Sequence, residues 1–247
     1  MEMGGSYILT DPVLVNKFLL FRRQSELGYD LGKLPELSAI LISHAHHDHL
    51  DLQSFKYIRS SVPVFVPVGL GSFVGKFIRN PVIEIKQWAK HTLPNGIEIT
   101  ATQAEHTGCR IPGLGYKTCN GYIISNANER IFFAGDTGPG THFEEIGKTY
   151  NIDTALLPIA GFLHKSLCRK GYMNPEQALA AFKSLNAKRM IPIHHGTFKF
   201  LGENTDAPAK KLAELADSEG MSEKVFILKS GEKIVGVRPL VSQSFAL

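Results

Sequence analysis

Short apolar runs recur along the chain, and longer stretches with helical periodicity separate them. The run at 97–102 alternates like a half-buried β-strand, whereas 175–186 has the pattern of an amphipathic helix. Asn174 before Pro175 is a favourable helix start. The spacing predicts a mixed α/β fold. Strands are expected at 6–10, 38–43, 62–66, 82–86, 97–102, 121–125, 130–134, 153–158, 189–193, 224–228 and 233–237, and helices near 50–60, 69–79, 141–150, 175–186 and 207–218.

A histidine-rich segment follows the strand expected at 38–43. It reads Ser-His-Ala-His-His-Asp-His-Leu-Asp and offers His44, His46, Asp48 and His49 as ligands. Imidazole and carboxylate groups together suit zinc and its first-row neighbours. A tract rich in histidine can also be a weak metal scavenger. Its position at the carboxyl end of a strand, where open α/β sheets place their sites, favours a specific metal site.

Three more candidate ligands come directly after short apolar runs of strand type. They are His106, Asp136 and His194. Taken alone, Asp136 is also compatible with an Asx turn, and His106 with a solvated loop. Because the same placement is repeated three times, we expect these side chains to join the histidine-rich segment in one site.

Coordination chemistry divides the seven candidates into two groups that share one carboxylate. One zinc ion would be held by His44, His46 and His106, and a second by Asp48, His49 and His194, with Asp136 bridging both. Open positions would remain on each ion for a shared water, as a catalytic site requires. The bridging hydroxide formed from it is a nucleophile at neutral pH. Asp48 is in addition the candidate catalytic proton acceptor.

Composition indicates an ordinary soluble globule. The chain has 247 residues, of which 43% are hydrophobic and 20% charged, so a single domain over 1–247 is sufficient. No apolar run is long enough to span a bilayer, and no signal peptide is visible. Three cysteines, Cys109, Cys119 and Cys168, cannot all pair, which favours a reducing, cytoplasmic compartment. The net charge of +4 is too mild for a typical nucleic-acid binder. The oligomeric state stays open.

One local cluster of basic and apolar residues lies at 13–23. Lys17, Arg22 and Arg23 alternate there with valine, leucine and phenylalanine. The cluster is compatible with a peripheral contact to a membrane, and it would suit an anionic headgroup. The favoured interpretation is a loop packed over the mouth of the site, with its basic residues solvated.

Motifs spread along almost the whole chain resemble one known family. They include Leu-Thr-Asp-Pro at 9–12, the histidine-rich segment, Phe-Phe-Ala-Gly-Asp-Thr-Gly at 132–138 and His-His-Gly-Thr-Phe at 194–198. The chain therefore resembles the metallo-β-lactamase fold, and within it the branch of the N-acyl-phosphatidylethanolamine phospholipases D and their bacterial relatives. The resemblance implies a four-layer αββα sandwich. The family usually opens with further strands before Asp-Pro, so the sheet is expected to lack an edge or the start to be truncated.

The same resemblance implies a function and assigns further residues. It implies a phosphodiesterase of phospholipase D type with a phospholipid or other small-molecule substrate, and it makes His194 rather than His195 the ligand. The departures from the family fall around the substrate: Tyr172 stands where the phospholipase has histidine, and His195 where tryptophan is usual. Arg110 is a candidate to steady the phosphate charge. Arg110, Tyr172 and His195 are thus the candidate substrate-binding residues.

Three other functions are compatible with the same ligands. A lactonase or other ester hydrolase would place a carbonyl against the same hydroxide. An iron oxidoreductase is less favoured, because diiron relatives usually carry an acidic residue where His46 or His49 stands. The third alternative is a non-catalytic scaffold stabilised by metal.

Overall fold

The computed structural model describes residues 1–110, 118–160, 171–198, 205–235 and 238–240. The first of its two main sheets is built from the first third of the chain. Its order is β1-β2-β5-β6-β7, and all neighbours except β1 and β2 are parallel. The strands are β1 (Glu2–Met3), β2 (Ser6–Thr10), β5 (Leu37–Leu41), β6 (Val64–Pro67) and β7 (Val82–Ile85).

The second sheet has six strands in the order β13-β12-β11-β10-β9-β8. Neighbours from β8 to β11 are antiparallel, whereas β11, β12 and β13 are parallel. Consequently β9, β11 and β13 all end at the same edge of the sheet. The strands are β8 (Lys90–Thr92), β9 (Glu98–Gln103), β10 (Asn120–Ser125), β11 (Arg130–Phe133), β12 (Thr154–Pro158) and β13 (Arg189–Ile193).

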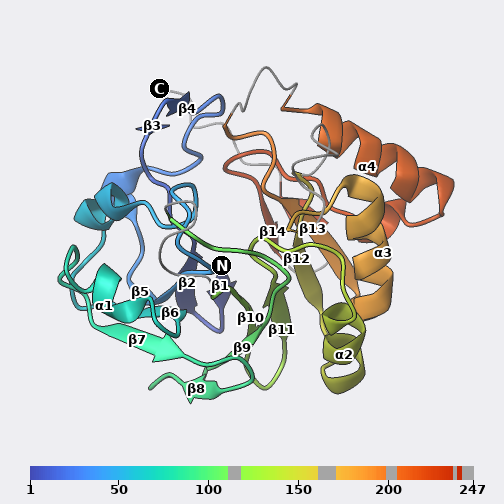
Figure 1. The fold of residues 1–247 in the computed structure, drawn as a ribbon. Coiled ribbons are helices and arrows are strands. Elements are labelled where there is room, and N and C mark those ends of the chain that lie inside the picture. Colours follow the sequence, from blue (N-terminus) through green and yellow to red (C-terminus); the bar gives the residue numbers. More distant parts are fainter. Residues whose placement is uncertain (111–117, 161–170, 199–204, 236–237, 241–247) are drawn as a thin grey trace.

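The two sheets pack face to face, and helices cover their outer faces (Figure 1). A central cluster joins Ile8, Leu41 and Phe65 of the first sheet to Ile99 and Tyr122 of the second. Each outer face has a cluster of its own, which buries the apolar sides of the covering helices. The expected order of helix, sheet, sheet and helix is thus present.

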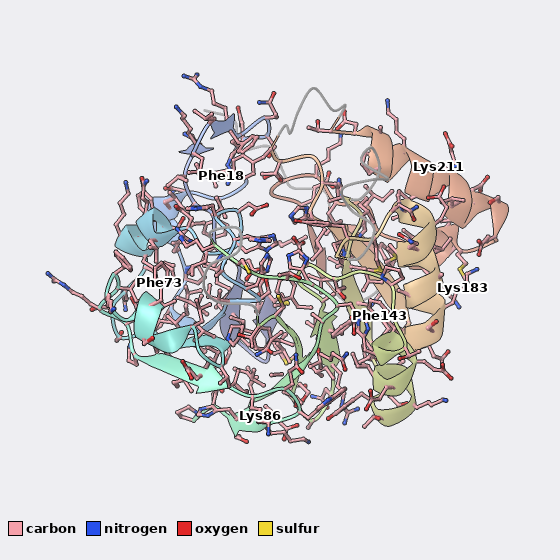
Figure 2. All side chains as sticks on the ribbon, in the orientation of Figure 1. Phe18, Phe73, Lys86, Phe143, Lys183 and Lys211 are labelled. Atoms are coloured by element: carbon pink, nitrogen blue, oxygen red, sulfur yellow. The ribbon has the colours of Figure 1, made fainter. Side chains whose placement is uncertain are left out.

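Three helices cover the second sheet: α2 (His142–Thr149), α3 (Pro175–Leu185) and α4 (Ala207–Ser218). The Asn174 side chain accepts a hydrogen bond from the Gln177 backbone N–H and so begins α3, as its sequence predicts. In Figure 2, Phe143 lies on the inner side of α2, whereas Lys183 and Lys211 lie on the outer surface. None of the helices in the described parts of the chain has the length and hydropathy needed to cross a bilayer.

The cover of the first sheet differs from the prediction. The helix expected near 50–60 is a short 3-10 helix, η2 (Leu52–Tyr57), and the one near 69–79 is the single turn α1 (Gly71–Val74). The cause at η2 is local: Asp51 accepts hydrogen bonds from both the backbone N–H and the hydroxyl of Ser54, which holds a tight first turn. The apolar pattern there predicts an α-helix, but the segment forms this shorter element.

The remaining elements are small. They are the hairpin of β3 (Lys17–Phe18) and β4 (Phe21–Arg22), the 3-10 turns η1 (Leu31–Lys33) and η3 (Ser222–Lys224), and the pair β14 (Lys233–Val235) and β15 (Arg238–Leu240). The strand expected at 224–228 is wrong, because only Val225 bridges to Met190 of β13. The last two residues of the strand expected at 233–237 lie outside the described residues, as does Cys168.

Candidate metal centre

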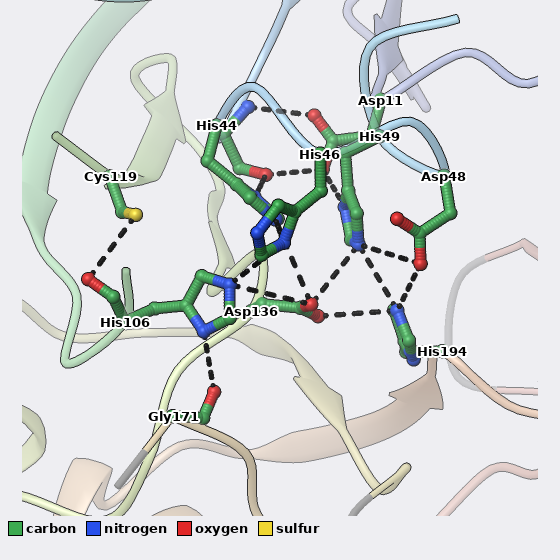
Figure 3. A network of polar contacts seen from close by, with 11 residues as sticks. Asp11, His44, His46, Asp48, His49, His106, Cys119, Asp136, Gly171 and His194 are labelled. Carbon is green, nitrogen blue, oxygen red and sulfur yellow. Dashed lines mark hydrogen bonds and ion pairs between the residues drawn. The ribbon is translucent and has the colours of Figure 1, made fainter. Parts of the chain in front are cut away.

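Loops from both sheets meet at one end of the sandwich (Figure 3). The loop after β5 carries four of the predicted ligands, and the loops after β9, β11 and β13 carry one each. Gly135, with φ +60°, lets the loop after β11 approach the first sheet: a Cβ there would lie 2.5 Å from that of Ser43. All seven residues predicted to be ligands are brought together here: His44, His46, Asp48, His49, His106, Asp136 and His194.

The first group of ligand atoms consists of His44, His46, His106 and Asp136. His46 Nδ1 lies 2.9 Å from His44 Nε2 and 3.2 Å from His106 Nε2. Asp136 Oδ2 lies 3.8 Å from His44 Nε2 and 4.0 Å from His106 Nε2. Three nitrogens and one carboxylate oxygen thus surround one point, which is the donor set that zinc prefers.

The second group consists of Asp48, His49 and His194. The Nε2 atoms of His49 and His194 are 3.1 Å apart, and Asp48 Oδ2 lies 3.4 Å from His194 Nε2. His194 has φ +58°, a left-handed backbone that costs a non-glycine residue about 1 kcal/mol. Such strain is concentrated at functional sites, and here it turns the ring toward the other ligands.

The Asp136 carboxylate lies between the two groups. Its Oδ2 is 3.2 Å from His49 Nε2, and its Oδ1 is 3.4 Å from His194 Nε2. Burial alone would raise the pKa of Asp136, but the neighbouring rings of His194 and His49 lower it to about 2. Both oxygens are buried without a hydrogen-bond donor, which is costly unless a cation compensates them. The residues therefore fit a metal.

A buried carboxylate behind the ligands, Asp11, fixes the protonation of two of the rings. Its Oδ2 accepts hydrogen bonds from His49 Nδ1, at 2.7 Å, and from the Ser43 hydroxyl, at 2.5 Å. That hydroxyl then accepts one from His44 Nδ1, at 2.8 Å. Both histidines thus carry their proton on Nδ1 and present a bare Nε2 to the site. His106 is oriented in the same way by the Gly171 carbonyl, at 2.8 Å.

Asp11 was not predicted as a site residue. The signal was present, because Asp11-Pro12 directly follows β2, a neighbour of β5, which precedes the histidine-rich segment. Its φ of +39° is unusual for a residue other than glycine. The Asp11 backbone N–H donates to the Leu41 carbonyl at the end of β5, so the two strand ends are held together.

Comparison with known proteins identifies the family. The model of the Beta-lactamase superfamily domain matches residues 6–195, which is most of the chain and includes every candidate ligand. The chain belongs to this family. The metallo-β-lactamase fold expected from its motifs is therefore confirmed.

Relatives of this β-lactamase superfamily domain include two phospholipases. The chain is 30% identical to N-acyl-phosphatidylethanolamine-hydrolyzing phospholipase D, mitochondrial, of Saccharomyces cerevisiae. The match covers 93% of the chain but only 52% of the yeast protein, so the chain spans about half the length of that relative. Identity is also 30% to N-acyl-phosphatidylethanolamine-hydrolyzing phospholipase D 1 of Caenorhabditis elegans, over 92% of the chain and 70% of the relative.

A solved structure agrees with this assignment. Igni18, described as a novel metallo hydrolase from Ignicoccus hospitalis, superposes with a TM-score of 0.72 at 25% identity, covering 94% of this chain and 91% of its own. Together, the family match, the ligand clusters and these relatives support a metal-dependent hydrolase of the metallo-β-lactamase fold.

The three candidate substrate residues of this superfamily domain lie in different surroundings. The Tyr172 ring lies near both ligand groups, with its centroid 5.0 Å from that of His106 and 6.3 Å from that of His194. Arg110 instead donates from Nη1 to the carbonyls of Ala45 and Leu50, which flank the histidine-rich loop. His195 follows the candidate ligand His194, and burial lowers the pKa of His195. Their contact with substrate stays a prediction.

Proposed function

We propose that the chain is a dinuclear zinc hydrolase that cleaves a phosphodiester bond, with N-acyl-phosphatidylethanolamine or a related phospholipid as substrate. One observation carries the proposal: two sets of ligand atoms share the buried carboxylate of Asp136. Paired cations suit in-line displacement at phosphorus, because charge develops on both the attacking and the leaving oxygen. The names of the yeast and nematode relatives support the choice of substrate class.

The proposed assignment of ligands follows the two groups. One ion would be held by His44 Nε2, His46 Nδ1 and His106 Nε2, and the other by Asp48, His49 Nε2 and His194 Nε2, with Asp136 shared between them. When bound, the two ions supply a water molecule that is nucleophilic at neutral pH and neutralise the phosphate charge.

Asp48 is the proposed catalytic residue among the ligands. Its side chain is 21% exposed, against 1% for Asp136, so it is the carboxylate that solvent and substrate can reach. Burial would raise the pKa of Asp48, but His49 and a hydrogen bond with His194 lower it well below its ordinary value. Asp48 is therefore ionised at neutral pH and can accept a proton from the nucleophilic water. Because Asp48 is a weak base, it would release this proton to solvent.

Tyr172 is the residue best placed to meet the substrate beside the ions. Its ring packs edge-on against His106 and lies tilted at 6.3 Å from His194, so it is near both ligand groups. We assign Tyr172 to positioning the scissile phosphate. Arg110 has a different task in this proposal, since its Nη1 stabilises the ligand loop; only its other guanidinium nitrogens remain for a phosphate.

Metal content and turnover test the proposal together. Elemental analysis of the purified chain should find two zinc ions per molecule, and an aryl phosphodiester should be hydrolysed at a rate that a chelator abolishes and added zinc restores. Vesicles of N-acyl-phosphatidylethanolamine should release phosphatidic acid. A panel of lactones serves as the competing substrate class. Phosphodiester turnover at the chelated background, with lactone turnover intact, would replace the phosphodiesterase by a lactonase; iron in place of zinc would point to redox chemistry.

A further inference from the structure

The hairpin of β3 and β4 combines three locally unfavourable features at one tip. Its turn residues Leu19 and Leu20 are 58% and 87% exposed. Leu19 also has φ +47°, a left-handed backbone that leucine rarely adopts. On the strands below, Lys17 is directly opposite Arg22, and like charges in facing positions repel. A hairpin shaped only for stability would carry glycine or asparagine at the turn and opposite charges on the strands.

No described carboxylate compensates the two cations within the hairpin or beside it. Lys17 and Arg22 are both exposed, and neither forms an ion pair with any residue in the described part of the chain. Residues 12–25 contain no acidic side chain at all. The tip thus presents apolar leucines at its end and positive charge just behind them. A binding partner with an apolar interior and an anionic surface would be complementary to both the leucines and the positive charges.

The hairpin is fixed to the wall of the metal centre. The Phe18 ring packs edge-on against Phe198 with 4.7 Å between centroids, and the Arg23 guanidinium lies 4.8 Å from the same ring. The Gln24 backbone N–H donates to the Thr197 carbonyl at 2.7 Å. Thr197 and Phe198 belong to the loop that begins with the ligand His194. The tip is therefore exposed, while its base contacts the loop that carries His194.

We propose that the β3–β4 hairpin docks the protein on an anionic phospholipid bilayer. Leu19 and Leu20 would enter the boundary between headgroups and acyl chains, and Lys17 and Arg22 would contact lipid phosphates. Two leucines at a protruding tip offer little apolar area for a stable contact with another protein, which commonly needs about 800 Å² on each partner. A bilayer accepts so small an insertion, because it adapts to the tip. Figure 1 shows the hairpin at the edge of the molecule, where a flat surface can reach it.

This inference deepens the proposed function, since docking would bring lipid substrate to the wall that carries His194, but the binding itself is measured without turnover. The assay is cosedimentation of the zinc-loaded full chain with phosphatidylcholine vesicles containing about a quarter phosphatidylglycerol, at about 0.15 M salt. The test variant combines Leu19→Asn with Leu20→Gln. Asparagine tolerates positive φ, so the turn is preserved while its apolar surface is removed.

A matched control replaces an exposed apolar residue on another face. Phe77, which is 59% exposed, becomes glutamine in Phe77→Gln. We expect the wild type and the control to bind anionic vesicles equally well. The affinity of the leucine variant for the same vesicles should be lower by about tenfold or more. Replacing Lys17 and Arg22 by glutamine should cost about fivefold for each charge and remove the preference for anionic vesicles.

Three outcomes would overturn the proposal. They are a wild type that does not bind anionic vesicles, a leucine variant that binds as well as the wild type, and a wild type that is a dimer which the leucine variant converts to monomer. Turnover of a soluble aryl phosphodiester is measured in parallel and should be equal in the wild type and the leucine variant. If neither the wild type nor the leucine variant hydrolyses the aryl phosphodiester, the proposed function is refuted. The vesicle-binding result would still test whether the hairpin docks on a bilayer.

Discussion

Replacing Asp11 by asparagine should move a proton on a metal ligand. In the wild type, Asp11 Oδ2 accepts from His49 Nδ1, so the lone pair on His49 Nε2 faces Asp136 and His194. An amide nitrogen in that position would be a donor facing a donor. The His49 ring avoids this contact between two donors if its proton moves from Nδ1 to Nε2. The Nε2 atom is then unable to bind a metal. Asparagine has nearly the shape of aspartate and tolerates the φ of +39°, so the backbone should be kept.

The magnitude follows from the bonds that change. The Ser43 backbone N–H can still donate to the asparagine carbonyl, but the amide nitrogen replaces the oxygen that accepts from His49, so that bond is lost outright, and the Ser43 hydroxyl loses the same acceptor. A hydrogen bond to a charged group contributes about 1.5–3 kcal/mol. That corresponds to about a 10- to 100-fold loss of metal affinity, the range found for residues that orient ligands from behind.

Competition with a chromophoric chelator measures the affinity directly. Asp51→Asn is the matched control, because Asp51 is also a buried carboxylate close to the same loop but contacts Ser54 instead of a ligand ring. The control should bind metal as the wild type does. A metal affinity of Asp11→Asn within about twofold of the control would refute the tautomer argument.

Three other changes have definite expected outcomes. Asp136→Ala should lose at least one metal ion per chain by elemental analysis and lower turnover about a thousandfold or more, with unchanged circular dichroism; full metal content would contradict the shared carboxylate. Gly147→Ala places a Cβ 2.7 Å from the Leu185 carbonyl, where α2 crosses α3, and should reduce the free energy of unfolding by about 1–3 kcal/mol in denaturant titrations. Partial burial would raise the pKa of Asp153, but the hydrogen bond from Lys188 and its neighbours lower it. Asp153 therefore stabilises the fold above its unfolded pKa, and this contribution is lost as the pH falls through the folded pKa. Asp153→Asn should cost about 1 kcal/mol at neutral pH and nothing in strong acid, whereas a cost independent of pH would show that charge is not involved.

The convergence of the candidate ligands could be predicted because their chemistry is local in sequence. His44, His46, Asp48 and His49 lie within six residues, and each remaining candidate lies within three residues of the end of an apolar strand. Strand ends at one edge of a sheet converge whatever the details of packing, so the order of the elements alone brings these side chains together. Most of the strands that carry them were predicted within two residues for the same reason.

The parts that could not be predicted depend on contacts between distant segments. Asp11 acts on His49 across 38 positions of the chain, and nothing near Asp11 shows which ring it contacts. The region after His49 has an amphipathic pattern, but the side chain of Asp51 closes a tighter turn than the pattern predicts. Likewise, the cluster at 13–23 does not show that Leu19 and Leu20 form a turn, because β3 and β4 are too short to give a strand pattern.

The division of the candidate ligands between the two sheets has a consequence for the stability of the protein in a cell. Four candidate ligands follow a strand of the first sheet and three follow strands of the second, so a metal bound at this centre would connect the two halves of the sandwich. Metal binding would then be a maturation step. In newly synthesised, metal-free chains the two sheets would separate more readily and be cleaved by proteases, whereas the metal-bound form would be stable. The abundance of the protein should accordingly follow the metal available during synthesis, even at constant transcription.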